Sequence, residues 1–181
     1  MCKGDIIIKF CGEHYFLDNF FPCEVTYDGL TYHSSEAAFQ AQKAPKEDRS
    51  KFAQLRKGAE AKKLGGKNGP YAMRQGSLEL QAWNKRSVSV MEEIVRAKFE
   101  QNPDLAEKLL ATGDLRLIEG NNHDDNLYGI QLKRVPGTRK KLLTDEDGCY
   151  ILDSEENEQN NHLGKILMKV REELKQNKTP L

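Results

Sequence analysis

Short apolar runs alternate with longer periodic stretches along this chain, and the alternation predicts both strands and helices. The run Ile6 to Phe10 is brief and β-branched, which is typical of a strand. Residues 24–33 hold two β-favouring runs separated by Asp28-Gly29, the pattern of a tight hairpin. Residues 115–119 form another short apolar run and predict a further strand.

Apolar residues that recur with a period of about 3.6 indicate helices elsewhere. We expect them over 34–44, 47–56, 59–65, about 83–101, 103–113 and 163–175. The first is capped by Ser34 or Ser35, and Pro45 marks its end. Pro103 suits a first helical position, and Gly113 terminates that helix.

Three polar or glycine-rich segments interrupt this pattern. Residues 65–77 contain four glycines and Pro70, which predicts a loop whose backbone amides can approach a ligand. Residues 120–129 form a polar loop, and the charged stretch at about 133–161 looks like an insertion with a short hairpin near Cys149. We therefore predict a mainly helical α+β single domain over residues 1–181, with a small N-terminal sheet and hairpin.

Composition excludes several classes of function. Lys plus Arg and Asp plus Glu both total 28, so the zero net charge disfavours general polyanion binding. The four cysteines form no zinc-ligand or CxxC spacing, which is typical of reduced thiols in a cytoplasmic protein. No apolar run approaches the roughly 20 residues of a membrane span, and neither a signal peptide nor a membrane anchor is expected.

Glu36, Gln40 and Lys43 are the first candidates for chemistry. Their spacing places all three on one narrow face of the first predicted helix. The same spacing is equally typical of a solvated polar stripe, with Glu36 favoured in the first turn by the helix dipole.

The loop 121–129 gathers two carboxylates, a histidine and an aromatic ring after a predicted strand, a common location for functional sites. Asp124 and Asp125 fit neither an EF-hand nor a zinc-binding histidine pair, so no metal site is expected and a hydrated turn is the alternative. His123 could act as a general base near neutral pH, but a lone loop histidine is usually solvated.

Several ordered motifs resemble the NADAR (YbiA-like) family. They are Asn19-Phe20-Phe21-Pro22, residues 27–32, Ser35-Glu36 followed by Phe39 to Lys43, Thr112-Gly113-Asp114, and Leu163-Gly164 followed by Leu167-Met168 and Arg171. The resemblance spans roughly residues 10 to 175, except for the insertion.

This resemblance implies an N-glycosidase, and neither a metal nor a tightly bound cofactor is implied. Family members act on phosphoribosylamino-pyrimidine intermediates of riboflavin synthesis or remove ADP-ribose from guanine bases. The expected partner is thus a small nucleotide-sugar substrate or an ADP-ribosylated nucleobase, either free or within nucleic acid, and the oligomeric state is not indicated. By resemblance, the catalytic candidates are Glu36, Lys43 and Asp125, and the substrate-binding candidates are Asn19, Phe20, Gln40, Trp83, Tyr128 and Gly129.

The chain departs from the family pattern at four positions. Tyr128 stands where relatives usually have tryptophan, and Ala37 where many have histidine. Gly66 and Leu80 stand where arginines are usual, so phosphate contacts must differ if those arginines hold phosphate. The cations that we consider as replacements are Lys67, Arg74 and Arg86.

Two mechanisms are compatible with these residues. Ribose–nitrogen cleavage develops oxocarbenium-like charge, so Glu36 and Asp125 could divide charge stabilisation or water activation from leaving-group protonation. Alternatively, a neutral Lys43 attacks the anomeric carbon and forms a Schiff base. In either scheme Trp83, Tyr128 and Phe20 or Phe21 could stack on a flat base, although core packing is an equal alternative.

Two other classes of function stay open at this stage. A non-catalytic ADP-ribose or nucleotide-binding module would keep the pocket without turnover. A structural adaptor would use the charged insertion to contact a protein partner.

Overall fold

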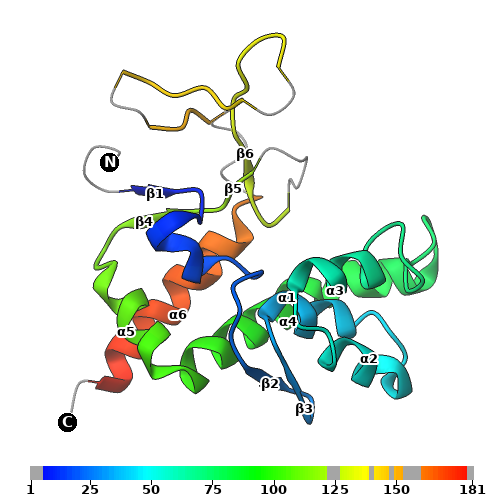
Figure 1. Cartoon of the computed structure of the whole chain (residues 1–181). Helices are drawn as coiled ribbons and strands as arrows, with labels where there is room; N and C mark the ends of the chain where they lie inside the picture. Colours follow the sequence, from blue (N-terminus) through cyan, green and yellow to red (C-terminus); the bar gives the residue numbers. More distant parts are fainter. Residues whose placement is uncertain (1–5, 122–126, 139–140, 147–148, 153–159, 179–181) are drawn as a thin grey trace. The chain divides into compact units, whose positions relative to one another are not determined.

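The structure is a computed structural model that describes residues 6–121, 127–138, 141–146, 149–152 and 160–178 (Figure 1). Contacts within the chain divide it into two compact units. One comprises Asn19–Ala106, and the other comprises Met1–Asp18 with Glu107–Leu181. The loop that holds His123, Asp124 and Asp125 lies outside the described residues.

The Asn19–Ala106 unit is built around one short, completely buried helix. Its elements are β2 (Val25–Tyr27), β3 (Leu30–Tyr32), α1 (Ser35–Ala41), the 3-10 helix η2 (Lys46–Asp48), α2 (Arg49–Ala53), α3 (Gly58–Gly65) and α4 (Leu78–Gln101). Helix α1 packs against α2, α3 and α4 (Figure 1). All of its residues are buried. Small side chains such as Ala37, Ala38 and Ala41 permit this close approach on several sides.

Local sequence signals explain how the chain enters α1. Asp28 and Gly29 adopt φ angles of 48° and 79°, the left-handed pair that a two-residue hairpin requires, and β2 pairs antiparallel with β3. The predicted hairpin is therefore confirmed. Ser34 then caps α1, because its Oγ accepts a hydrogen bond of 3.1 Å from the amide of Ala37.

Helix α4 contributes a long apolar face to this unit's core. It begins at Leu78, earlier than the expected start near Trp83, because Ser77 caps it by accepting a hydrogen bond of 3.2 Å from the amide of Leu80. The apolar face runs through Val90, Met91, Ile94, Val95 and Phe99, all of which are buried.

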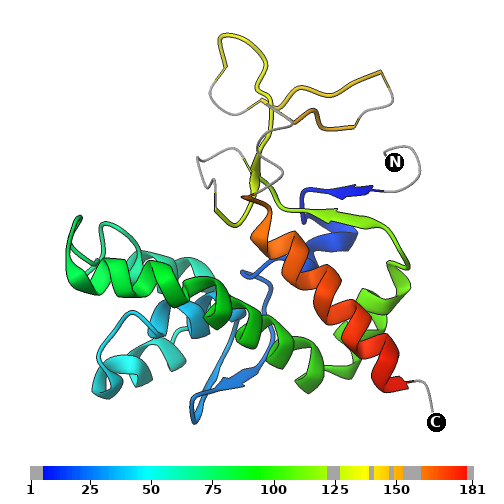
Figure 2. The same cartoon turned by 180° about the vertical axis from the view of Figure 1, so that it is seen from behind.

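The other unit combines short strand pairs with a long C-terminal helix. Its elements are β1 (Ile6–Ile8), the 3-10 helix η1 (Gly12–Leu17), the end of α5 (Pro103–Ala111), β4 (Arg116–Ile118), β5 (Gly120–Asn121), β6 (Ile130–Gln131) and α6 (His162–Lys178). Strand β1 pairs in parallel with β4, and β5 pairs in parallel with β6. Helix α6 packs against β4 (Figure 2).

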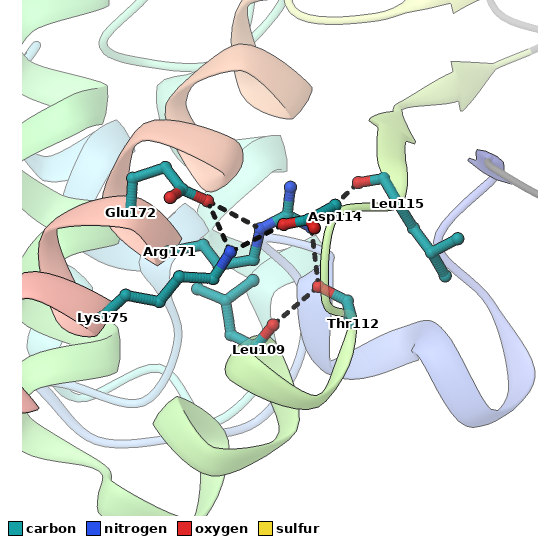
Figure 3. Close-up of polar contacts among 7 residues, drawn as sticks. All are labelled: Leu109, Thr112, Asp114, Leu115, Arg171, Glu172 and Lys175. Atoms are coloured by element: carbon teal, nitrogen blue, oxygen red, sulfur yellow. Dashed lines mark hydrogen bonds and ion pairs between the residues drawn. The ribbon is translucent and has the colours of Figure 1, made fainter.

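A buried arginine ties α6 to the turn between α5 and β4 (Figure 3). Arg171 donates hydrogen bonds of 2.8 Å to Thr112 Oγ1 and to the carbonyl of Leu115. Thr112 in turn donates to the carbonyl of Leu109, and Lys175 pairs with Asp114 at 2.8 Å. The Thr-Gly-Asp motif and the arginine thus serve one structural anchor.

These elements confirm the mainly helical α+β fold class, with two corrections. Among the described residues, the named strands form three two-stranded pairs, because β1 pairs with β4 and β2 pairs with β3. The segment before Asn19, for which the sequence pattern predicted no helix, contains η1. Within the 133–161 stretch, isolated antiparallel bridges join Arg134 to Leu142 and Thr144 to Tyr150, in agreement with a short hairpin near Cys149.

No helix in the described part of the chain is both long and apolar enough to span a bilayer.

Candidate active site

Three side chains, two on α1 and one in the turn that follows it, form a hydrogen-bonded chain. Gln40 Nε2 donates to Glu36 Oε1 at 2.8 Å, and Lys43 Nζ donates to Gln40 Oε1 at 2.9 Å. Glu36 is 4% exposed and Gln40 is 0% exposed, so this face is not a solvated stripe and that alternative is wrong. A polar face buried between helices must be satisfied internally, and this chain of contacts does so.

Lys43 has an unusual electrostatic environment. Its ammonium also donates to the carbonyl of Gly65 at 3.3 Å, and it lies 5.5 Å from the centre of the Phe39 ring. Burial, followed by the positive charge of Lys62, lowers the pKa of Lys43 from 10.5 to about 8, while Glu36 opposes the shift. At pH 7 roughly a tenth of such an amine is neutral, against roughly one part in three thousand at the ordinary pKa.

Asn19 and Phe20 lie beside the start of α1. The backbone carbonyl of Asn19 accepts a hydrogen bond of 2.9 Å from the amide of Glu36. A Cβ on Gly58 would lie 3.1 Å from Phe20 Cδ1 and 3.3 Å from Glu36 Cβ, so these two side chains meet at this glycine. Among the described residues, nothing donates a hydrogen bond to the buried Oδ1 of Asn19. A ligand donor group is one way to satisfy it.

Trp83 connects this chain to a surface cleft of about 330 Å³. The indole packs at 55° against Phe39 with ring centres 5.0 Å apart, and Lys43 Nζ lies 5.7 Å from the indole centre. The Arg86 guanidinium lies 5.0 Å from the centre of the Trp83 ring and donates to the carbonyl of Gln42 at 3.0 Å. Trp83 is 6% exposed, so its side chain is part of the buried core and its exposed edge lines the cleft.

The cleft also bears on the expected phosphate contacts. Of the three cations considered from the sequence, Arg86 lines it, whereas Lys67 and Arg74 are exposed residues outside its lining. Arg49, which sequence reasoning missed, lines the cleft as well and forms an ion pair with Asp28 at the hairpin turn.

Tyr128 and Gly129 belong to the other unit. The carbonyl of Tyr128 accepts a hydrogen bond of 3.1 Å from the amide of Leu163, and a Cβ on Gly129 would overlap the carbonyl oxygen of Glu119. These contacts account for the glycine and fix the backbone here. Asp125 lies outside the described residues. Its role, and the catalytic and binding roles of the other candidate residues, stay predictions.

Lys62 is a second residue of this neighbourhood that sequence reasoning missed. Its Nζ lies 3.5 Å from Glu36 Oε1, and its side chain is 53% exposed. In sequence it is one of several lysines on a charged helix, and only its position on the turn before Gly65 hints at the contact.

Within the described ranges, no three histidine, cysteine, aspartate or glutamate side chains gather as a metal site would require. The expectation of a metal-free site stays a prediction.

The fold places this chain in a known structural class. The solution structure of YbiA from Escherichia coli superimposes with a TM-score of 0.68 at 24% identity, covering 100% of this chain and 92% of YbiA. The fold is therefore YbiA-like. The NADAR domain model matches residues 9–175, and the chain belongs to the NADAR family.

Curated relatives give the family its chemical context. A riboflavin biosynthesis protein of Vibrio vulnificus is 36% identical over 91% of this chain and 36% of its own length. An N-glycosidase of Acanthamoeba polyphaga mimivirus is 35% identical over 52% of this chain and 48% of its own length. The N-glycosidase YbiA of Escherichia coli is 29% identical over 86% of this chain and 79% of its own length. The chain thus spans about a third and about half of the first two relatives.

Proposed function

We propose that this protein is an N-glycosidase that hydrolyses the ribose–nitrogen bond of an ADP-ribosyl or phosphoribosylamino compound. The observation that carries the proposal is the buried chain from Glu36 through Gln40 to Lys43, whose lysine has a pKa of about 8. A carboxylate and a partly neutral amine joined through one buried amide are groups that such a reaction needs. The names of the relatives agree with this chemistry.

The lowered pKa favours the covalent scheme. Neutral Lys43 Nζ attacks the anomeric carbon, and the carbon–nitrogen bond breaks as the base leaves with the electron pair and takes up a proton. Loss of a proton from Nζ and opening of the sugar ring give an imine. Water then hydrolyses the imine, which releases the sugar and restores the amine.

Glu36 has a role in either scheme. Its carboxylate can stabilise positive charge on the sugar or activate the attacking water, with Asp125 taking the complementary task. Arg86 and the indole of Trp83 supply a cation and a flat surface at the cleft, which suit a phosphate and an aromatic base.

Base release measured by chromatography tests the activity. ADP-ribosylated guanine in DNA and a phosphoribosylamino-pyrimidine are incubated in parallel with the wild type, Glu36→Gln and Asp125→Asn. We expect release from one substrate and a loss of about 100-fold or more in each variant. Glu60→Gln, an exposed carboxylate on α3, is the matched control and should retain activity. Tight ADP-ribose binding without release from either substrate would instead identify a binding module.

Borohydride reduction during turnover tests the covalent scheme. The wild type should gain the mass of the reduced sugar at Lys43, and Lys43→Met should not. Lys63→Met removes an exposed lysine and should be trapped like the wild type. Turnover without any adduct would replace the lysine scheme by the paired-carboxylate scheme.

A further inference from the structure

An exposed lysine contacts the buried carboxylate of the proposed site. Lys62 Nζ lies 3.5 Å from Glu36 Oε1, where the Lys62 side chain is 53% exposed and that of Glu36 is 5% exposed. The same oxygen accepts the hydrogen bond from Gln40. Glu36 therefore has a cation on one side and a neutral amide on the other, and Lys43 reaches it only through Gln40.

Helix α3 contacts every member of the chain on α1. Lys62 pairs with Glu36, and the carbonyl of Gly65, three residues later on the same face, accepts from Lys43 Nζ at 3.3 Å. A Cβ added to Gly65 would lie only 2.7 Å from Oε1 of Gln40, so α3 also packs closely against the middle residue of the chain. The last turn of α3 thus contacts all three residues of the hydrogen-bonded chain, and Lys62 provides the charged contact.

The charges around Lys43 come from four elements. They are Glu36 on α1, Lys62 on α3, Arg49 on α2, and Glu79 and Arg86 on α4. Glu79 is exposed, and Asp28 pairs with Arg49. Glu36 is therefore the buried anion for which Lys43 and Lys62 compete, and a cation beside a carboxylate weakens the attraction of that carboxylate for a second cation.

We propose that Lys62 is a positioning residue that engages Glu36 and so keeps the amine of Lys43 available as a nucleophile. This inference rests on the proposed function, because it assumes that Lys43 attacks the substrate. In physical terms, Lys62 lowers the pKa of Lys43, which agrees with the direction in which that pKa is shifted.

The charge state of Lys43 can be measured without any substrate. Trace acetylation of the full-length protein over about pH 6 to 11, with the label at Lys43 quantified by peptide mass spectrometry, gives the titration of that amine. Lys62→Met should raise the midpoint and lower the labelling of Lys43 at pH 7 by about threefold. Because Lys62 is half exposed, salt at about 0.5 M should shrink the difference.

Two control variants separate charge from structure. Lys62→Arg keeps the cation, so the midpoint of Lys43 labelling should equal that of the wild type. Lys63→Met removes the exposed neighbouring lysine and should also leave this midpoint unchanged. An unchanged midpoint in Lys62→Met, or the same shift in Lys62→Arg and Lys62→Met, would overturn the proposal.

Activity gives the second readout. In Lys62→Met the acidic limb of kcat/KM against pH should move upward by the same amount as the labelling midpoint, which loss of packing alone would not produce. If the wild type releases no base from either substrate, the glycosidase proposal fails, whereas the labelling still decides whether Lys62 controls the charge of Lys43. An unmoved acidic limb in an active Lys62→Met variant would contradict the nucleophile role.

Discussion

Gln40 is the residue on which the polar chain of α1 depends, because one amide serves two charged neighbours. Its nitrogen donates to Glu36 and its oxygen accepts from Lys43, and the side chain is completely buried. Removal of the amide would leave the carboxylate with one fewer donor and the ammonium with one fewer acceptor.

Gln40→Leu keeps the approximate volume but removes both contacts. We expect it to lower the free energy of unfolding by about 1–3 kcal/mol, because buried charged groups lose hydrogen bonds. Urea denaturation followed by circular dichroism measures the change. Gln54→Leu, at an exposed position, is the control and should alter stability by less than about 0.5 kcal/mol. Equal stabilities of both variants would show that the hydrogen bonds of Gln40 to Glu36 and Lys43 contribute nothing to folding.

Lys43 makes stability depend on pH in an unusual direction. Its pKa is about 8 in the folded protein and 10.5 in the unfolded reference, so the unfolded chain binds more protons between these values. The free energy of unfolding should therefore rise with pH across that window, relative to Lys43→Met, and level off above it. Urea titrations of both proteins at several pH values check this, and parallel pH curves would contradict the assigned pKa.

The spacing of Glu36, Gln40 and Lys43 predicted correctly that the three side chains are neighbours, although α1 ends at Ala41 and Lys43 lies in the turn after it. The spacing could not predict that Glu36 and Gln40 are buried. Burial depends on α3, which reaches α1 from a distant part of the sequence through Gly65 and Lys62. Sequence spacing describes one helix at a time, whereas satisfaction of a buried polar group requires knowledge of its neighbours.

At the scale of elements, the packing of α3 on α1 depends on glycine. A Cβ at Gly65 would lie 2.7 Å from Gln40 Oε1 and 3.2 Å from its backbone oxygen, whereas at Gly58 the nearest atoms lie at 3.1 Å or more and belong to side chains. The two glycines mark the two ends of α3, and only the one at the C-terminal end leaves no room.

Gly65→Ala should therefore cost about 1–3 kcal/mol, because either α3 or the Gln40 side chain must move. Gly58→Ala should cost less, since nearby side chains can shift by a few tenths of an ångström. Thermal denaturation of both variants compares them directly. The reverse order of stabilities would contradict the close packing at Gly65.

Helices and strands were predictable where a cap or a turn residue was present. The Asp28-Gly29 turn and the Ser34 cap marked the hairpin and α1 correctly. The start of α4 was misplaced because its cap, Ser77, follows a glycine-rich stretch, and η1 was missed because a short 3-10 helix has no long periodicity. The pairing of β1 with β4 joins segments far apart in sequence, which local patterns do not encode.

At the scale of the whole molecule, the family match over residues 9–175 extends across both compact units. The sequence prediction of one domain implies that the units unfold together. Arg171 offers a test from within the Glu107–Leu181 segment, because it is 4% exposed and holds the turn before β4 through Thr112 and Leu115.

Arg171→Met should destabilise its own unit by about 1–3 kcal/mol, since buried acceptors lose a charged donor. If the chain is one cooperative domain, hydrogen exchange should quicken in α1 as well as in α6. Lys175→Met, which removes an exposed ion pair with Asp114, should change exchange little in either helix. Faster exchange confined to α6 would contradict the single-domain prediction.

Trp83 has an optical consequence, because it is the only tryptophan of the sequence. All indole emission from this protein arises at the cleft, beside the cationic groups of Lys43 and Arg86. A compound that enters the cleft displaces water and changes the field at the ring, so the emission wavelength and intensity report occupancy without any label. Titrations followed by Trp83 emission can therefore measure the dissociation constants of inert analogues, and the affinities of variants that have lost turnover.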